Sequence, residues 1–304
     1  MKLKISNVTK SIVPVFIIGF IYLKTQSFIP GVIGALISII IEHLLSRQID
    51  NCLDNLLVSS GNNTWEKSQK KLEKEGKLID STIVRISFAY LFRIKVDGKY
   101  FLVPNTRTGK FQPVGGAYKF NEEEAKFLSE NFFVENDDCI PVDKITKRDY
   151  RLLIKNKYLK KFMKHFDKTN NRENLNNLSR EFIEELIKTK IINKDEFKSL
   201  SYRYCGRHMT EIEETVFKPF ELLLADVVEV ILSDKQEEIF RSLMKKKSNK
   251  YIFATVSDIK SCGVKAGTQN LKDSIANHTY KILSESSDLL SKKNKNHKII
   301  TIEL

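Results

Sequence analysis

The stretch LSREFIEEL, residues 178–186, places one arginine and three glutamates on a short segment. On a helix, Glu181, Glu184 and Glu185 are three and four residues apart, so their side chains share one face. Carboxylates this close repel one another unless a cation lies among them. Their hard oxygens suit Mg²⁺ or Mn²⁺, which can hold a diphosphate and a water molecule. The alternative is a solvated acidic face on which Arg180 pairs with Glu184, four residues further on.

The composition of the whole chain favours an anionic partner. Its 304 residues include 51 Lys and Arg against 38 Asp and Glu, a net charge of +13. Such an excess suits phosphates or an anionic membrane surface. The four cysteines are far apart and contain no C-x-x-C pair. This argues against a zinc cluster or a disulfide framework, and for reduced thiols in a cytosolic domain.

The N-terminal segment differs in character from the rest of the chain. Residues 11–45 contain two apolar runs separated by a short polar break. We expect residues 1–46 to form a two-helix hairpin in the bilayer; a buried hairpin of a soluble protein and a single kinked anchor are the alternatives. Lysines precede the first run and Arg47 follows the second, so the positive-inside rule puts both ends in the cytoplasm. Small residues four apart in the second run suit helix association in lipid, although glycine and alanine are common in spans.

The remainder of the chain predicts a layered α/β domain. Residues 47–81 are polar and helical in pattern, and we expect them to form a connector between the membrane hairpin and the domain at 82–304. From Thr82 onward, β-branched and aromatic residues predict a strand, and Asp97-Gly98 predicts the turn of a hairpin. Helical spacing returns at 146–168 and 175–190. Strands interspersed with helices indicate an α/β architecture.

One basic segment stands out within this domain. Residues 144–168 carry ten Lys and Arg against two Asp, and apolar residues recur among them at helical spacing. The pattern predicts an amphipathic basic helix. Its charged face suits the phosphates of a ligand beside the glutamates, or an anionic lipid surface. The alternative is a solvated lysine-rich face whose apolar side belongs to the core.

The run DGKYFLVPNTRTGKFQPVGG resembles the start of a Nudix domain, in which a hairpin leads into a glycine corner. The Nudix box has the pattern G-x5-E-x7-R-E-U-x-E-E-x-G-U, where U is a bulky apolar residue. Gly116 to Glu122 fits the first part, and residues 180–185 fit R-E-U-x-E-E, with 57 residues between the two halves where the family has seven. Ile187 and Lys188 stand where the pattern has glycine and an apolar residue.

The resemblance implies a fold and a site. The fold would be a divergent Nudix-like α/β/α sandwich with a mixed sheet over residues 82–304, with an insertion at about 123–179. In the family, Mg²⁺-assisted hydrolysis of nucleoside diphosphate derivatives uses the box glutamates; here Glu181, Glu184 and Glu185 would be the catalytic residues and metal ligands. Arg180 would orient them. The candidate ligand-binding residues are Arg107, Lys110, Gly115, Gly116, Arg180 and Arg207.

A membrane hairpin joined to such a domain resembles the membrane-spanning Nudix effectors of bacterial CBASS anti-phage systems. This resemblance implies a sensor for a cyclic oligonucleotide that a partner nucleotidyltransferase makes. Homo-oligomers of the hairpin would then disrupt the inner membrane and cause abortive infection. We therefore expect a ligand-gated effector that binds its ligand without turning it over. The alternatives are a membrane-tethered Mg²⁺-dependent Nudix hydrolase and a membrane-anchored binding protein without a switch.

Overall fold

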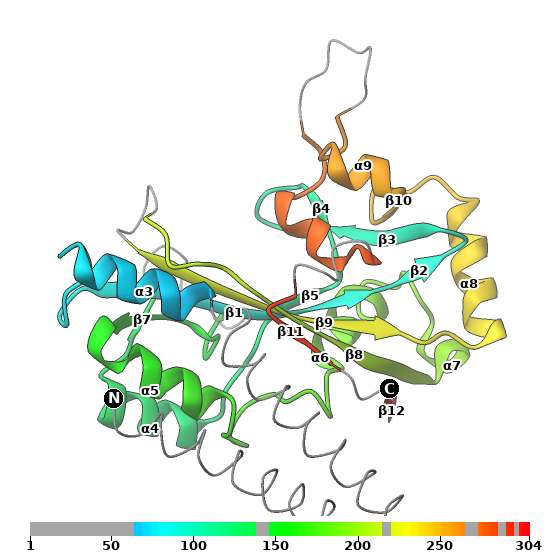
Figure 1. Ribbon diagram of the computed structural model, residues 1–304. Coiled ribbons are helices and arrows are strands. Elements are labelled where there is room, and N and C mark those ends of the chain that lie inside the picture. The colour runs from blue at the N-terminus through cyan, green and yellow to red at the C-terminus, as the bar shows by residue number, and fades with distance from the viewer. Residues whose placement is uncertain (1–63, 138–145, 215–219, 265–272, 285–289, 295–297) are drawn as a thin grey trace, which may run out of the picture. The chain divides into compact units, whose positions relative to one another are not determined.

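The computed structural model describes residues 64–137, 146–214, 220–264, 273–284, 290–294 and 298–304 (Figure 1). These residues belong to one compact unit, Thr64–Leu304. The predicted hairpin at 1–46 and most of the predicted connector lie outside the described residues. The last part of the connector contains helix α3 (Thr64–Lys74).

A mixed sheet forms the centre of the described unit. Strand β1 (Ile83–Arg93) runs parallel to β9 (Glu221–Val230), from Arg85 opposite Glu221 to Arg93 opposite Glu229. On its other edge β1 pairs with two antiparallel strands in succession, β7 (Arg151–Lys155) and then β5 (Gly115–Ala117). The sheet is completed by β8 (Ser199–Met209), β12 (Ile299–Glu303), β11 (Lys292–Lys293) and β6 (Glu135–Asn136).

A smaller sheet follows directly from β1. Its strands are β2 (Lys95–Val96), β3 (Lys99–Pro104), β4 (Phe111–Gln112) and β10 (Ile252–Ala254). The predicted Asp97-Gly98 turn between β2 and β3 is confirmed, because both residues have positive φ, 47° and 76°. This is the backbone conformation that a two-residue hairpin requires.

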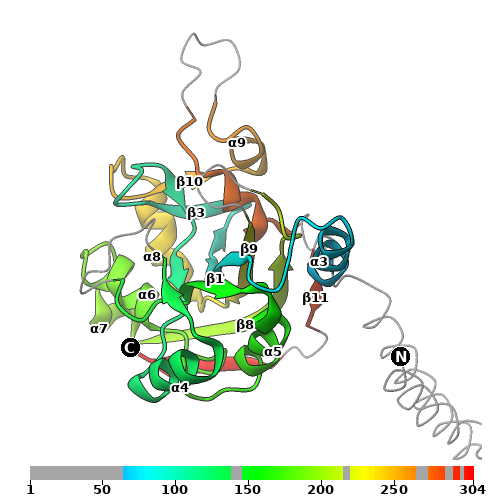
Figure 2. The same cartoon turned by 90° about the vertical axis from the view of Figure 1, so that its left-hand side faces the viewer.

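Helices cover the sheets. They are α4 (Glu122–Phe132), α5 (Asn156–Phe166), α6 (Arg180–Phe182), which continues as the π-helical turn η1 (Ile183–Ile187), α7 (Lys194–Phe197), α8 (Asp234–Met244), α9 (Val256–Lys260) and the 3₁₀ helix η2 (Asn277–Ile282). In both views α4 and α5 lie on one side of the large sheet, and β3, β10 and α9 lie on the other (Figure 2).

Alternate residues of β1 build the core. Phe88, Tyr90 and Phe92 are fully buried. The Phe88 ring contacts Phe166 of α5 with centroids 4.8 Å apart, and the Phe92 ring contacts Phe182 of α6 at 5.9 Å. Period-2 alternation on β1 thus anchors both helices to one face. Phe182 and Leu186 are the two buried apolar side chains of the α6–η1 segment that carries the glutamates.

The basic segment differs from its prediction. Residues 151–155 form strand β7, and the helix begins only at Asn156. Pairing of β7 with residues 83–87 of β1 overrides the helical spacing there. From Asn156 onward the amphipathic pattern is confirmed, since Leu159, Phe162, Met163 and Phe166 are all buried.

The membrane part of the predicted fold class requires correction. Within the described part of the chain, no helix is long and apolar enough to cross a bilayer. The longest described helices, such as α4 and α8, have 11 residues, whereas a span needs about 20. This finding overturns the transmembrane element of the predicted fold class and the predicted inner-membrane location. The mixed α/β part of the prediction holds.

Candidate functional site

Strand β5 supplies the glycine corner of the site. Gly115 has a φ of +148°, and a Cβ there would lie 2.2 Å from the carbonyl oxygen of Tyr90. A Cβ on Gly116 would lie 2.0 Å from Oε1 of Glu181. Gly115 is therefore required for the close approach of β5 to β1, whereas a side chain at Gly116 would displace the end of the Glu181 side chain. The Gly115 N–H also donates to Oε2 of Glu185 at 3.0 Å.

Arg180 organises the acidic side of the site. Its Nη1 donates to Glu181 Oε1 at 2.7 Å and to Glu184 Oε2 at 3.2 Å. Its Nη2 donates to the carbonyl oxygen of Ala117 at 2.8 Å, which ties α6 to β5. The predicted orienting role of Arg180 is consistent with these contacts. The guanidinium and two of the three glutamates form one charge-assisted network.

Glu173 is a member of this network that the sequence pattern did not indicate. Its carboxylate accepts from both Nε and Nη2 of Arg180, at 2.7 and 3.1 Å, and from the backbone N–H of Lys119 at 2.8 Å. Glu122, which fits the Nudix pattern in sequence, instead forms an ion pair with Arg148 and is largely exposed. Six residues separate Glu173 from Arg180, one fewer than the family pattern has. A search with one residue of tolerance would have found it.

The glycine corner, Arg180 and the three box glutamates line a cavity of about 710 Å³. Seven of the predicted site residues contribute to it: Arg107, Gly115, Gly116, Arg180, Glu181, Glu184 and Glu185. Residues that the sequence did not indicate complete the wall, among them Asn105, Gln112, Thr146, Asp149, Arg151, Thr189, Asn249 and Lys250. Segments far apart in the chain therefore meet at the glycine corner.

Two predicted ligand-binding residues lie elsewhere. Lys110 forms an ion pair with Asp273 and does not line the cavity. Arg207 is buried on β8, where it donates to both oxygens of Asp226 at 2.8 and 3.0 Å and to Asp167 at 2.7 Å. Its charge is satisfied inside the protein, which is the arrangement expected of a structural ion pair.

The buried carboxylates have perturbed proton affinities. Burial, reinforced by the negative charges of Glu181 and Glu184, raises the pKa of Glu185 to about 8. Burial also raises the pKa of Glu181, although Arg180 opposes this shift. The Glu185 carboxyl is therefore largely protonated at neutral pH, and the acidic wall carries less negative charge than its sequence implies.

The carboxylates do not converge on one point. Glu181 and Glu184 are both bound to Arg180, and Glu185 is bound to a backbone N–H. Among the described residues, no three His, Cys, Asp or Glu side chains are grouped so that they could hold a metal ion. The residue types suit Mg²⁺, but their arrangement does not fit a resident ion.

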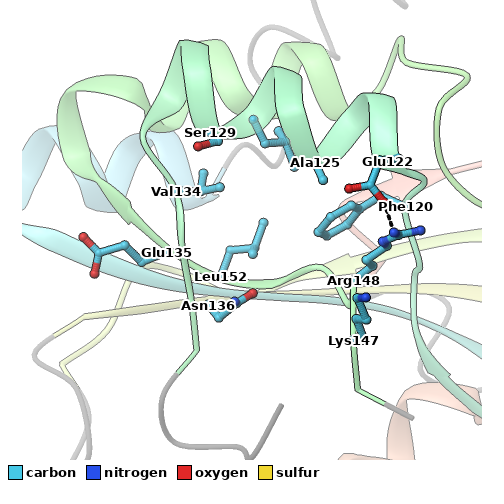
Figure 3. Close-up of a pocket in the computed structure, with 11 residues that line it drawn as sticks. Phe120, Glu122, Ala125, Ser129, Val134, Glu135, Asn136, Lys147, Arg148 and Leu152 are labelled. Carbon is cyan, nitrogen blue, oxygen red and sulfur yellow. Dashed lines mark hydrogen bonds and ion pairs between the residues drawn. The ribbon is translucent and has the colours of Figure 1, made fainter. Parts of the chain in front are cut away.

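A second cavity, of about 780 Å³, lies under α4 (Figure 3). Its lining is mainly apolar, with Phe120, Leu128, Val134 and Leu152 among the contributors. The Glu122–Arg148 ion pair lies at one end of it. None of the predicted site residues lines this cavity. The smaller cavity at the glycine corner is therefore the candidate functional site.

The fold and the site together define a Nudix-like domain: a mixed sheet, a glycine corner and an R-E-U-x-E-E segment packed against it. The family model of the SMODS-associated NUDIX domain matches residues 83–283. The chain belongs to this family. The match supports a Nudix-type effector of a CBASS-type defence system and a link to a SMODS nucleotidyltransferase-type system. No curated protein matches the chain.

Proposed function

We propose that this chain is the sensor of a CBASS-type system and binds a cyclic oligonucleotide in the 710 Å³ cavity. The observation that carries the proposal is the convergence of the glycine corner, Arg180 and Arg107 on one cavity in a SMODS-associated NUDIX domain. A nucleotidyltransferase of the same system would supply the ligand.

The cavity suits a nucleotide in size and charge. Its volume lies within the range of small-molecule sites, about 300–1,000 Å³. Arg107, Arg151 and Lys250 offer cations to phosphate oxygens, while Arg180 adds positive charge although its N–H donors are already engaged. No aromatic side chain is found among the described residues that line it. Nucleobases would therefore stack on guanidinium planes or on the apolar surface of Val103 and Pro104.

Binding without turnover is the form of the proposal that the geometry favours. Arg180 occupies two carboxylates that hydrolysis in the family would use, and Ile187 stands at the position of the box glycine. The alternative, a Mg²⁺-dependent Nudix hydrolase of a nucleoside diphosphate derivative, is favoured by the retained R-E-U-x-E-E spacing alone. Fold similarity by itself does not establish that activity.

The test is calorimetric titration of the full chain with a panel of cyclic di- and trinucleotides, with and without Mg²⁺, followed by product analysis of each mixture. We expect saturable binding of one ligand, which is recovered intact. Metal-dependent breakdown of a ligand, abolished by Glu184→Gln together with Glu185→Gln, would establish the hydrolase instead. Absence of binding across the panel would reject the sensor.

Homo-oligomer formation on ligand binding stays a prediction. Light scattering after size-exclusion chromatography, with and without the ligand found in the titration, measures it directly. An unchanged molar mass at saturating ligand would contradict this prediction and leave the binding proposal intact.

A further inference from the structure

We propose that Arg107 and Arg151 form a clamp for a phosphate or phosphodiester group in the 710 Å³ cavity. The inference rests on the proposed function and deepens it, because it names the part of the ligand that these two side chains hold. Neither arginine belongs to the R-E-U-x-E-E segment, and the sequence did not indicate Arg151.

The loop between β3 and β4 presents Arg107 to the cavity. Asn105 fixes this loop: its Oδ1 accepts the backbone N–H groups of Arg107 and Thr108 at 2.9 and 3.1 Å, and its Nδ2 donates to Gln112 at 2.8 Å. The Arg107 side chain is exposed and makes no ion pair within the described part of the chain. A guanidinium on a fixed loop, facing a cavity with its donors free, is available to an anion.

Arg151 reaches the same cavity from the large sheet. It stands opposite Ser87 on β1, two residues from Ala89, which pairs with Ala117 of β5. This places it at the junction where β7 gives way to the glycine strand. Its Nη1 donates to Asp149 at 3.0 Å, and its guanidinium makes no other hydrogen bond among the described residues. The side chain is mostly buried, but no nitrogen of Arg151 is among the buried side-chain atoms that lack a partner, so its remaining N–H donors are accessible from the cavity.

The two arginines repel each other. Burial and the positive charge of Arg107 both act to lower the pKa of Arg151, and the negative charges of Asp149 and Glu181 oppose the shift only in part. Asp149 itself is shared with Lys119, whose Nζ lies 2.6 Å from Oδ1. An anion between the two guanidinium groups would relieve this repulsion and fill the free donors at once.

The chemistry of the site selects an oxyanion. Arginine presents several N–H donors in a planar fork that matches two oxygens of one phosphate or carboxylate, whereas a neutral amide offers a single acceptor oxygen. The guanidinium groups of Arg107 and Arg151 lie on different elements. Together they can bind both free oxygens of a phosphodiester, or each can bind one oxygen of a diphosphate. The glutamate wall then faces the rest of the ligand.

Inorganic pyrophosphate is the probe that tests the clamp, because it needs no recognition of base or ribose. Calorimetry on the full chain at about 0.15 M salt, where long-range attraction is screened, gives its Kd. We expect Arg107→Ala to weaken binding about tenfold or more, the loss of one charge-assisted contact. Arg151→Lys, which keeps the charge and loses the fork, should weaken it as well. Arg241→Ala on α8, which removes one exposed arginine elsewhere, is the charge-matched control and should bind as the wild type does.

Each outcome decides a separate point. If the wild type does not bind pyrophosphate, or if Arg107→Ala binds it as tightly as Arg241→Ala, the clamp is overturned. If pyrophosphate behaves as expected but no cyclic oligonucleotide binds, the clamp stands as an oxyanion site and the proposed function fails. A urea titration of Arg107→Ala checks that folding is unchanged, which we expect because the side chain is exposed.

Discussion

Replacing Glu185 with glutamine should change how the stability of the protein depends on pH. The carboxyl has its pKa raised from the ordinary value of 4.5 to about 8, mainly by burial, with the negative charge of Glu181 adding to the shift. Glutamine has nearly the same shape, and its oxygen can still accept the Gly115 N–H that now donates at 3.0 Å. Glu185→Gln therefore removes the titration while it keeps the hydrogen bond.

The direction in which stability changes with pH follows from proton linkage. Between pH 4.5 and pH 8 the folded state holds a proton on Glu185 that the unfolded state has released, so stability falls as pH rises. The stabilisation of the folded state by the Glu185 proton is fully present below pH 4.5 and is lost as pH rises through about 8. One pKa unit corresponds to about 1.4 kcal/mol, so the wild type should lose about 2.5 kcal/mol between pH 5.5 and 7.5 from this group alone.

Urea unfolding at pH 5.5, 6.5 and 7.5 measures the effect. The free energy of unfolding of Glu185→Gln relative to the wild type should rise by about 2.5 kcal/mol across this range, a shift of about 1 M in the urea midpoint. Glu130→Gln, which removes an exposed carboxylate on α4, is the control and should follow the wild-type curve. A constant difference between Glu185→Gln and the wild type at all three pH values would refute the assignment of a buried, protonated carboxyl.

Two further changes test the framework of the site. Gly116→Ala places a methyl group 2.0 Å from Oε1 of Glu181, so that carboxylate must leave Arg180. We expect the free energy of unfolding in urea to fall by about 1–3 kcal/mol and ligand binding to weaken. A variant with unchanged stability would contradict the close approach of β5 to α6. Glu173→Gln removes the charged partner of two Arg180 nitrogens and should cost about 1–3 kcal/mol, whereas Glu122→Gln should cost less than about 0.5 kcal/mol. Equal costs at these two positions would show that Glu173 is not the structural partner of Arg180.

Local patterns predict the parts of the fold that depend on neighbours in the chain. Asp97-Gly98 forms its turn because glycine adopts positive φ freely and aspartate tolerates it better than most residues. The buried face of residues 156–166 follows from the helical spacing of its apolar side chains. The glutamate segment can be recognised because the spacing of Glu181, Glu184 and Glu185 places their side chains together on one short helix.

Contacts between distant segments cannot be predicted in this way. Residues 151–155 are a strand because β1 offers an unpaired edge, which no local pattern reveals. Lys110 and Arg207 resemble ligand-binding residues in sequence because their partners, Asp273 and Asp226, are 163 and 19 residues away. A basic residue beside a glycine looks the same in sequence whether its charge faces a ligand or a buried aspartate.

The hydrogen bonds of Arg180 bear directly on the choice between a sensor and a hydrolase. Its guanidinium donates to Glu173, to Ala117 and to two of the three box glutamates. A cation bound by those glutamates would have to displace Arg180 from them, at a cost of about 1.5–3 kcal/mol for each charge-assisted hydrogen bond. A phosphate held by the clamp arginines displaces nothing, because each of them has free donors. An anionic ligand at these two arginines would leave the contacts of Arg180 in place, which favours the proposed sensor over the hydrolase.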